Sequence, residues 1–301
     1  MRKYRLGLDG GGSHSQAIVT DEQDNLIREA EGRGLNPLSL GWDVFRNNFD
    51  ELLGSALKEI PKEEVAGVCA GLAGTGSETV RKRAQNEIAA LLPGTRVLVI
   101  SDALAALWGA FGGGAGLLLI AGTGSICLGM DGRGRTARSG GFGRLLGDEG
   151  GGYWIAVEAM RWALKANDVG GSSAHLEAAI REEFRLLDLR DVIPLAHDDP
   201  PDRIAALARR ILVLSASDAD AREIIYQAGE HLAALVANTA RKLGLAGPQV
   251  ALWGGLWNSS RKELQEALLR AFETKGYAAT VTTPTQTPPW GAIRCLRREM
   301  P

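Results

Sequence analysis

Two glycine-rich segments decide the fold of this chain: LDGGGS at residues 8–13 and AGTGS at residues 121–125. Each segment lies between two strand-like runs, and a polar turn follows the second run. Glycine lacks a Cβ atom, so the backbone N–H groups of such loops can approach phosphate oxygens and donate to them. A tight hairpin that needs positive φ would use the same residues. Because the pattern occurs twice, with the hydroxyls of Ser13 and Thr123 at matching places, we predict that both loops bind one polyphosphate.

The composition is that of an ordinary globular chain, with 301 residues, of which 45% are hydrophobic and 23% charged. This length accommodates two domains with cores of their own. The formal net charge of -2 gives no bulk attraction to nucleic acid or to an anionic membrane. No apolar run reaches the roughly 18 residues of a membrane-spanning helix, and the chain enters a strand without a signal peptide. We therefore expect a cytoplasmic protein with no nucleic-acid or membrane partner.

The cysteines and histidines show no metal-binding pattern. Cys69, Cys127 and Cys295 are isolated and form no CxxC pair, and the four histidines lack metal-ligand spacing. A disulfide framework, a cysteine zinc site or an iron–sulfur cluster is therefore not expected.

The strand and helix patterns divide the chain into two similar halves. A three-strand meander opens each half, and buried strands alternate with amphipathic helices after it, which is typical of mixed sheets covered by helices. The glycine-rich stretch at 111–116 is the candidate linker. The predicted meander strands are 4–9, 15–20 and 26–31 in the first half, and 117–120, 126–130 and 135–139 in the second.

Two aspartates follow or end predicted strands of the first half. Asp9 cannot contact phosphate favourably by itself, but it suits a Mg²⁺ ion, bound directly or through water. Asp102 follows the buried strand 97–100 and starts a helix, at the strand end where open α/β sheets place ligands. A carboxylate there can take the proton from an attacking hydroxyl. Ser101 or Asp102 can equally serve as the helix cap, and the sequence leaves both roles open.

Two further glycine-rich stretches carry candidate ligand groups. In the run 140–154, Asp148 and Glu149 can accept hydrogen bonds from sugar hydroxyls, or they can cap the helix that follows. Gly254 and Gly255 follow a predicted strand, where an adenine ring can lie against the backbone; a plain strand-to-helix turn explains them equally well.

Together these residues resemble the sugar kinase/hsp70/actin superfamily, and within it the N-acetylglucosamine kinase group of the BadF/BadG/BcrA/BcrD ATPase family. The most specific part is the string GGxGxxxGDEGxxxWI at 140–155. The resemblance implies an α/β, actin-like ATPase fold: two ribonuclease-H-like domains with a nucleotide cleft between them. The domains would be 1–111, joined by the C-terminal helix 288–301, and 112–287. It also implies an ATP- and Mg²⁺-dependent kinase that phosphorylates an amino sugar at its 6-hydroxyl, and a possible homodimer.

The same resemblance implies a role for each candidate residue. The base would be Asp102 and the Mg²⁺ ligand Asp9; phosphate contacts would come from Gly11, Gly12, Ser13, Gly122 and Thr123; adenosine contacts from Gly254 and Gly255; and sugar contacts from Asn36, Gly124, Ser125, Gly141, Asp148 and Glu149.

Several positions around the implied sugar site depart from the family pattern, among them Leu38, Ala73 and Phe142. The sequence therefore leaves N-acetylglucosamine, glucosamine and N-acetylmuramic acid open as substrates. Two other functions stay open on the same fold. One is the ATPase activator of a radical dehydratase or reductase, which needs cysteine thiolates for a shared cluster. The other is a non-catalytic sugar sensor.

Overall fold

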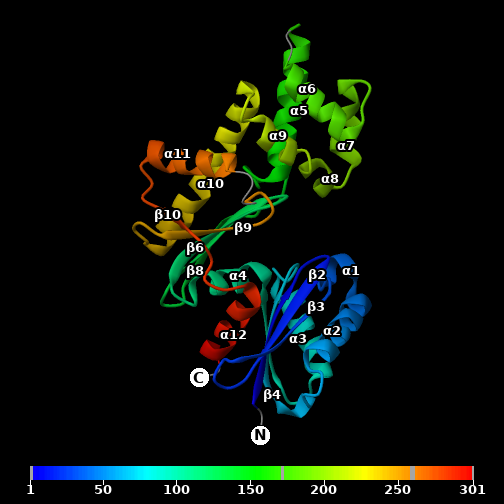
Figure 1. Ribbon diagram of the computed structural model, residues 1–301, viewed down its shortest axis with the longest axis vertical. Coiled ribbons are helices and arrows are strands. Elements are labelled where there is room, and N and C mark those ends of the chain that lie inside the picture. The colour runs from blue at the N-terminus through cyan, green and yellow to red at the C-terminus, as the bar shows by residue number, and fades with distance from the viewer. Residues whose placement is uncertain (1–2, 171–172, 258–261, 300–301) are drawn as a thin grey trace. The chain divides into compact units, whose positions relative to one another are not determined.

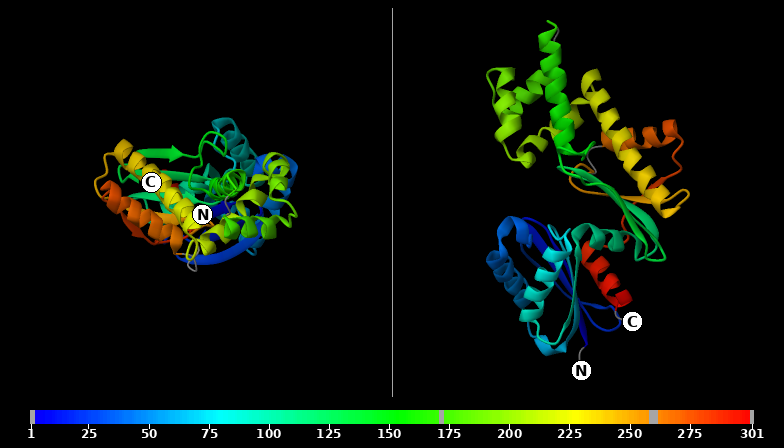
Figure 2. Two further views of the ribbon diagram at one scale, coloured as in Figure 1. Left: turned by 90° about the horizontal axis from the view of Figure 1, so that it is seen from above. Right: turned by 180° about the vertical axis from the view of Figure 1, so that it is seen from behind.

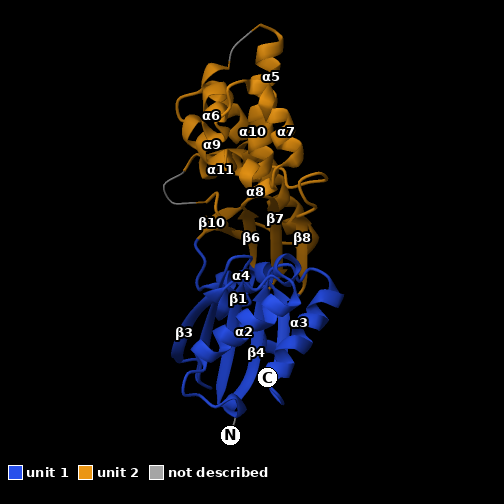
Figure 3. Cartoon of the chain, turned by 90° about the vertical axis from the view of Figure 1, so that its right-hand side faces the viewer, with its two compact units in different colours: residues 1–115, 132–134, 283–301 blue, residues 116–131, 135–282 orange. Residues whose placement is uncertain are grey.

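The computed structural model describes residues 3–170, 173–257 and 262–299. The chain divides into two compact units, each built on its own sheet (Figure 3). Unit 1 consists of Met1–Ala115, Gly132–Gly134 and Thr283–Pro301, and unit 2 of Gly116–Asp131 and Arg135–Thr282. The domain bounds expected from the sequence stay a prediction, because these units are defined by packing alone.

Unit 1 contains five strands, five α-helices and one 3₁₀ turn within the described residues. The elements are β1 (Tyr4–Gly10), β2 (His14–Thr20), β3 (Leu26–Arg33), α1 (Pro37–Leu40), α2 (Trp42–Ala56), the 3₁₀ turn Lys62–Glu64, β4 (Val65–Leu72), α3 (Glu78–Leu91), β5 (Arg96–Ser101), α4 (Asp102–Phe111) and α12 (Pro288–Glu299). The last two residues of the predicted helix 288–301 lie outside the described residues.

Unit 2 has its own five strands and a larger set of helices in the part of the chain that is described. The elements are β6 (Ala115–Ala121), β7 (Ser125–Asp131), β8 (Thr136–Gly140), α5 (Gly152–Asp168), α6 (Ala174–Phe184), the 3₁₀ turn Leu189–Asp191, α7 (Val192–Asp198), α8 (Pro201–Ala205), α9 (Ala208–Leu214), α10 (Ala219–Leu243), β9 (Gln249–Trp253), α11 (Glu263–Lys275) and β10 (Thr280–Thr282).

The two sheets have the same topology. Their strand orders are β3-β2-β1-β4-β5 and β8-β7-β6-β9-β10, so a meander supplies three strands and two later strands complete each sheet. In both sheets the later strands run parallel to the first strand of the meander. This repeat confirms the meander predicted in each half of the sequence.

In unit 1 helices cover both faces of the sheet. Leu6 and Leu8 on β1 pack into a core with Phe45 of α2, on the face that α2 and α3 cover. Gly7, between them, points to the other face, where a Cβ atom would lie 2.2 Å from the carbonyl oxygen of Pro289 in α12. Only glycine lets α12 lie this close to β1. Figures 1 and 2 show α12 across the sheet from α2 and α3.

In unit 2 close helix packing on the sheet also depends on glycine. A Cβ atom at Gly129 of β7 would lie 2.3 Å from the side chain of Leu117 and 2.8 Å from that of Leu243 in α10. A Cβ atom at Gly229 of α10 would lie 2.6 Å from the backbone of Ala267, so α10 and α11 also pack closely. Within the described residues, no helix is both long enough and apolar enough to cross a bilayer.

Candidate active site

The first glycine loop joins β1 to β2 and is fixed by its own backbone. The N–H of Gly11 donates to the carbonyl oxygen of His14 at 2.9 Å and closes the hairpin. Gly12 and Ser13 are exposed, and nothing lies within 4 Å of the place where a Cβ atom of Gly12 would be. A Cβ atom at Gly34, by contrast, would lie 2.1 Å from the carbonyl oxygen of Gly12. The neighbouring chain therefore supports the loop from one side and leaves the other side open.

Asn36 lies beside this loop and caps helix α1. Its Oδ1 atom accepts from the backbone N–H of Leu38 at 3.0 Å. The preceding residue, Leu35, donates its backbone N–H to the carbonyl oxygen of Gly11 at 2.8 Å. A Cβ atom at Gly74 would lie 2.3 Å from Oδ1 of Asn36. Asn36 is thus fixed between the first loop and the turn after β4, and capping occupies its carbonyl group.

Asp9 and Asp102 lie at the same edge of the unit 1 sheet. The parallel registers pair Asp9 with Gly71 on β4, and Leu72 with Ser101 on β5. The hydroxyl of Ser101 accepts from the N–H of Leu104 at 3.2 Å and caps α4. Of the two capping residues that the sequence left open, the cap is therefore Ser101. Asp102 is the first residue of the helix itself.

Both aspartates are partly buried. Burial, and after it the negative charge of Asp102, raises the pKa of Asp9 to about 6, against the lowering effect of His14. Burial also raises the pKa of Asp102, against a hydrogen bond of 2.8 Å from the N–H of Ala103 to its Oδ1 atom. Two carboxylates that share a dry region disfavour each other's charge. A cation or a proton bound there would reduce the unfavourable charge of both carboxylates.

The second glycine loop joins β6 to β7 and anchors helix α5. The N–H of Gly122 donates to the carbonyl oxygen of Gly124 at 2.9 Å. The carbonyl oxygens of Gly122 and Thr123 accept from the N–H groups of Gly152 and Tyr153 at 2.8 and 2.9 Å. Because these bonds use N–H groups at the start of α5, the loop and the helix form one rigid element.

Asp148 and Glu149 lie against the second loop. The hydroxyl of Ser125 donates to the carbonyl oxygen of Glu149 at 2.7 Å. Oδ1 of Asp148 accepts from the N–H of Gly143 at 3.3 Å. Its Oδ2 atom lies 2.2 Å from the place that a Cβ atom of Gly124 would occupy. Asp148 also has φ of 62°, a left-handed conformation that is uncommon outside glycine.

The alternative that the sequence left open for these two acids, capping of the helix that follows, does not occur. Helix α5 has Gly151 as its N-cap, and no side chain caps it. Burial raises the pKa of Asp148, while the backbone N–H groups of Gly143 and Ser125 lower it. Gly141 joins the same cluster, because its N–H donates to the carbonyl oxygen of Ser125 at 3.0 Å. The long loop therefore folds back on the second glycine loop and turns the Asp148 carboxylate toward it.

Gly254 and Gly255 emerge at the same sheet edge as the second loop. Strands β6 and β9 are parallel neighbours in which Ile120 pairs with Trp253, so both chains leave the sheet together. A Cβ atom at Gly254 would lie 2.4 Å from the carbonyl oxygen of Ala121, whereas Gly255 faces open space. The positive φ of 107° at Gly254 also requires glycine.

Sequence reasoning missed one residue of the second loop's surroundings. The hydroxyl of Thr123 donates to the carboxylate of Asp202, in the first turn of α8. Helix α8 is five residues long and falls in a part of the chain with weak helical patterning. The sequence signal that could have identified Asp202 is an acid that follows a proline at the start of a helix. The same pattern also fits an ordinary exposed turn.

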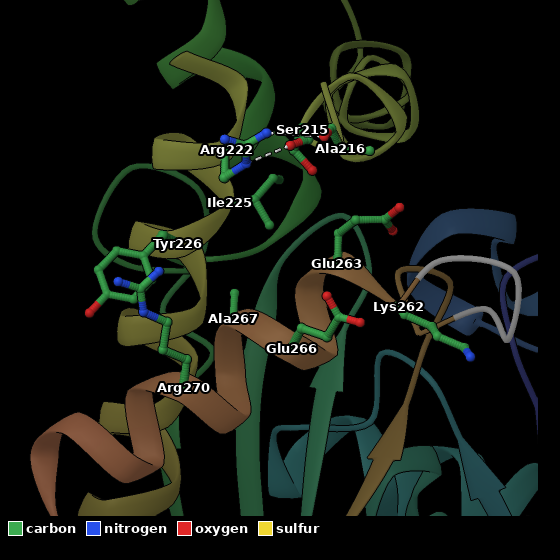
Figure 4. A pocket seen from close by; sticks show the side chains of 10 residues that line it. All are labelled: Ser215, Ala216, Arg222, Ile225, Tyr226, Lys262, Glu263, Glu266, Ala267 and Arg270. Atoms are coloured by element: carbon green, nitrogen blue, oxygen red, sulfur yellow. Dashed lines mark hydrogen bonds between the residues drawn. The ribbon is translucent and has the colours of Figure 1, made fainter. Parts of the chain in front are cut away.

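A cavity in unit 2 has a volume of about 720 Å³ and lies between α10 and α11 (Figure 4). Arg222, Ile225 and Tyr226 line it from α10, and Glu266 and Arg270 line it from α11. The guanidinium of Arg270 lies 4.6 Å from the ring centroid of Tyr226. A planar ring system with polar edges would find stacking, apolar and charged partners in this cavity.

The described residues contain no cluster of three or more His, Cys, Asp or Glu side chains that could enclose a metal ion. Mg²⁺ does not require such a cage, because it usually keeps several waters and binds one or two carboxylates together with substrate phosphates. Asp9, whose pKa burial and the charge of Asp102 raise, fits this kind of site in unit 1.

Comparison with solved structures confirms the fold. A candidate N-acetylglucosamine kinase of Chromobacterium violaceum has a TM-score of 0.76 and 26% identity, over 97% of this chain and 98% of that one. A ROK family glucokinase of Streptomyces griseus, solved with glucose and AMPPNP, has a TM-score of 0.60 and 17% identity, over 98% and 99%. The actin-like ATPase fold predicted from the sequence is therefore confirmed.

Characterised relatives extend over most of the chain. An N-acetylmuramic acid/N-acetylglucosamine kinase of Clostridium acetobutylicum is 31% identical over 266 residues, which cover 85% of this chain and 86% of the relative. An N-acetyl-D-glucosamine kinase of Dictyostelium discoideum is 30% identical over 204 residues, or 64% of each chain. A sequence model of the BadF/BadG/BcrA/BcrD ATPase family matches residues 6–293. With the repeated sheets, the glycine loops and the strand-end carboxylates in place, this match shows that the chain belongs to the BadF/BadG/BcrA/BcrD ATPase family.

Proposed function

We propose that this protein transfers the γ-phosphoryl group of ATP to the 6-hydroxyl of an amino sugar. The observation that carries the proposal is the position of Asp102: a partly buried carboxylate at the end of β5, at the same sheet edge as Asp9, where the first glycine loop leaves β1. The kinase names of the two relatives above support the same reaction class.

In this reaction Asp102 accepts the proton of the sugar hydroxyl. The hydroxyl oxygen forms a bond to the γ-phosphorus, the bond from that phosphorus to the β–γ bridging oxygen breaks, and ADP leaves. The raised pKa of Asp102 makes its carboxylate a stronger base than that of an exposed aspartate. Catalysis of this kind depends mainly on positioning and on charge stabilisation.

The glycine loops of both units supply the phosphate contacts in this proposal. In unit 1 these are Gly11, Gly12 and Ser13, and in unit 2 Gly122 and Thr123. Their backbone N–H groups and hydroxyls donate to phosphate oxygens without adding side-chain bulk. Asp9 would hold Mg²⁺, which neutralises charge on the phosphates.

Unit 2 also supplies the proposed adenosine and sugar contacts. Adenosine would contact Gly254 and Gly255, and the cavity in Figure 4 is the candidate space for its ring, because α11 follows this loop in the chain. The sugar hydroxyls would bond to Asp148 and Glu149, with Gly124, Ser125 and Gly141 forming the surface against which they lie. Asn36 of unit 1 would add its amide group.

The activator alternative is weakened by the cysteines. All three are buried, and burial raises the pKa of Cys127 to about 12. A cluster shared between subunits needs exposed thiolates. The sensor alternative is weakened by the presence of Asp9 and Asp102 together, since a protein that only binds sugar does not need a partly buried base.

A coupled assay of ADP release tests the proposal. Purified protein with ATP and Mg²⁺ is offered glucosamine, N-acetylglucosamine, N-acetylmannosamine, N-acetylmuramic acid and glucose in separate reactions. We expect ADP release that depends on an amino sugar, and a phosphorylated sugar as the product. ADP release that no sugar stimulates would overturn the proposal.

A further inference from the structure

A second cavity in unit 2 begins at the proposed sugar-binding acids and follows helix α5. Its volume is about 400 Å³. Asp148 and Glu149 line it together with Arg144, and Tyr153 and Arg161 line it from α5. Tyr153 and Arg161 are eight residues apart, so they lie on one face of the helix. A sugar bound to Asp148 would therefore have space beside it for a substituent.

Arg144 lines this cavity and has no carboxylate partner in the described parts of the chain. Other contacts hold its side chain in place. Its Nη1 atom donates to the hydroxyl oxygen of Tyr153 at 3.1 Å. Its guanidinium carbon lies 5.3 Å from the ring centroid of the same tyrosine. Arg161, by contrast, forms an ion pair with Glu158 on its own helix. The stacked guanidinium of Arg144 keeps donors available for a ligand.

The other groups around Arg144 fit a ligand that is partly apolar. Leu145 and Leu146 are 83% and 82% exposed, although both line the cavity. Val157 and Trp154 line it from α5, and the ring centroid of Trp154 lies 5.0 Å from that of His231. Exposed leucines beside a polar site are typical of a surface that a ligand covers.

We infer that this cavity is a subsite for a carboxylate-bearing substituent of the amino sugar, bound by Arg144. The inference rests on the proposed function, because it places the sugar ring on Asp148 and Glu149. A guanidinium binds a carboxylate through two parallel N–H···O bonds, and such charge-assisted bonds are stronger than those to neutral groups. The acids Asp148 and Glu149 would repel a carboxylate placed on them, so the acidic group points toward Arg144 and the hydroxyls toward the acids.

A comparison of two substrates tests whether this cavity binds an acidic substituent or the site accepts only neutral sugars. N-acetylmuramic acid carries a lactyl ether with a carboxylate and a methyl group, and N-acetylglucosamine is its neutral counterpart. We expect kcat/KM for N-acetylmuramic acid to exceed that for N-acetylglucosamine. Arg144→Leu should lower the ratio of the two kcat/KM values by about tenfold, the lower end for a charge-assisted hydrogen bond, because Arg144 is exposed.

Two further variants make the test specific. Arg144→Lys keeps the charge but loses the planar fork, so it should lower the ratio by less than Arg144→Leu does. Arg241→Leu removes an arginine that lines a different cavity, which shares Leu146 and Glu149 with this one. It should leave the ratio of the two kcat/KM values unchanged. Calorimetric titration of N-acetylmuramic acid without ATP should show weaker binding to Arg144→Leu than to the parent protein.

The outcomes distinguish the two proposals. Phosphorylation of N-acetylglucosamine without phosphorylation of N-acetylmuramic acid would overturn the acidic subsite and leave the kinase proposal standing. So would an unchanged ratio in Arg144→Leu. If no amino sugar is phosphorylated, the kinase proposal fails, and the subsite fails with it.

Discussion

The two sheets of this protein have one topology, but acids stand at the carboxyl ends of the first and fifth strands in unit 1 and not at the matching ends in the sheet of unit 2. Strand β1 ends in Asp9 and Gly10, whereas β6 ends in Ile120 and Ala121. The residue directly after the fifth strand is Asp102 for the sheet of unit 1 and Thr283 for the sheet of unit 2, although Thr283 itself belongs to unit 1. The three acids described near the second glycine loop, Asp148, Glu149 and Asp202, lie outside the sheet of unit 2, on the loop after β8 and on α8.

This difference shows how two sheets of the same topology can serve two kinds of chemistry. The sheet positions a glycine loop in both units, because that loop depends only on strand order and on a hairpin. The carboxylates depend on single residues, and these differ between the units. We expect charge changes in unit 1 to affect the chemical step and the stability of the empty protein, and changes in unit 2 to affect substrate binding.

The largest expected effect is that of Asp102→Asn. The amide keeps the shape of the side chain but cannot accept the proton of the sugar hydroxyl. Loss of general-base catalysis lowers kcat by about 10²- to 10⁴-fold. Steady-state kinetics with the accepted amino sugar measures this loss, and titration of ATP should show nearly unchanged binding.

The matched control is Thr283→Ala, at the corresponding position after the fifth strand of unit 2. It should leave kcat within a factor of two. Full turnover in Asp102→Asn, or an equal loss in Thr283→Ala, would remove the proposed asymmetry of the two units.

The next effect is a gain of stability in Asp9→Asn. Because the pKa of Asp9 is about 6 in the folded protein and 3.8 for an ordinary aspartate, the folded state binds the proton more tightly than the unfolded state does. Ionised Asp9 therefore costs the folded state about 2–3 kcal/mol at pH 7, and the cost disappears as the pH falls below about 4. Urea denaturation at pH 7 should show Asp9→Asn as more stable than the parent, although it is inactive.

A repeat of that denaturation at pH 4 provides the control. The difference between the two proteins should shrink there, because both folded states are then neutral at this position. A variant that is equally stable at pH 7 would contradict the burial and charge repulsion at Asp9.

Two glycine substitutions should have opposite consequences in the two units. In Gly34→Ala the new Cβ meets the backbone of Gly12, which cannot turn aside, so we expect a loss of about 1–3 kcal/mol in stability and a higher KM for ATP. In Gly124→Ala it meets the side chain of Asp148, which can rotate away. We expect nearly unchanged stability there and a KM for the amino sugar raised by about tenfold. Thermal unfolding and the two KM values measure the contrast.

If Gly124→Ala changed the KM for ATP and spared that for the sugar, the second loop would not position Asp148 for the sugar. The proposed role of unit 2 in sugar binding could then no longer rest on the contact between Gly124 and Asp148.

Much of the two sheets could be predicted from the sequence, because the sequence signals for strands and turns are local. Alternating apolar residues and glycine-rich turns mark the meander, and the turns recur at similar places in both halves. The prediction that the hydroxyls of Ser13 and Thr123 occupy matching places was less accurate. Loop residues 11–13 and 122–124 place Ser13 third and Thr123 second, so the two are offset by one position.

The site was less accessible to sequence reasoning, because its contacts join distant segments. Ser101 and Asp102 are adjacent, and only the hydrogen bond from Leu104 shows which of them caps the helix. The positive φ of Asp148 depends on how a whole loop folds back on Gly124.

The smallest expected effect concerns Asp202, and it bears most directly on the comparison. Asp202 places an exposed negative charge on the hydroxyl of Thr123, where we propose that a phosphate binds. Asp202→Asn keeps an acceptor and removes the charge, so the KM for ATP should fall two- to fivefold, as expected for an exposed charge worth up to about 1 kcal/mol. Thr123→Ala should raise it instead. If Asp202→Asn raised the KM for ATP as much as Thr123→Ala, Asp202 would belong to the nucleotide site, and unit 2 would contribute a carboxylate to ATP binding as well as to sugar binding.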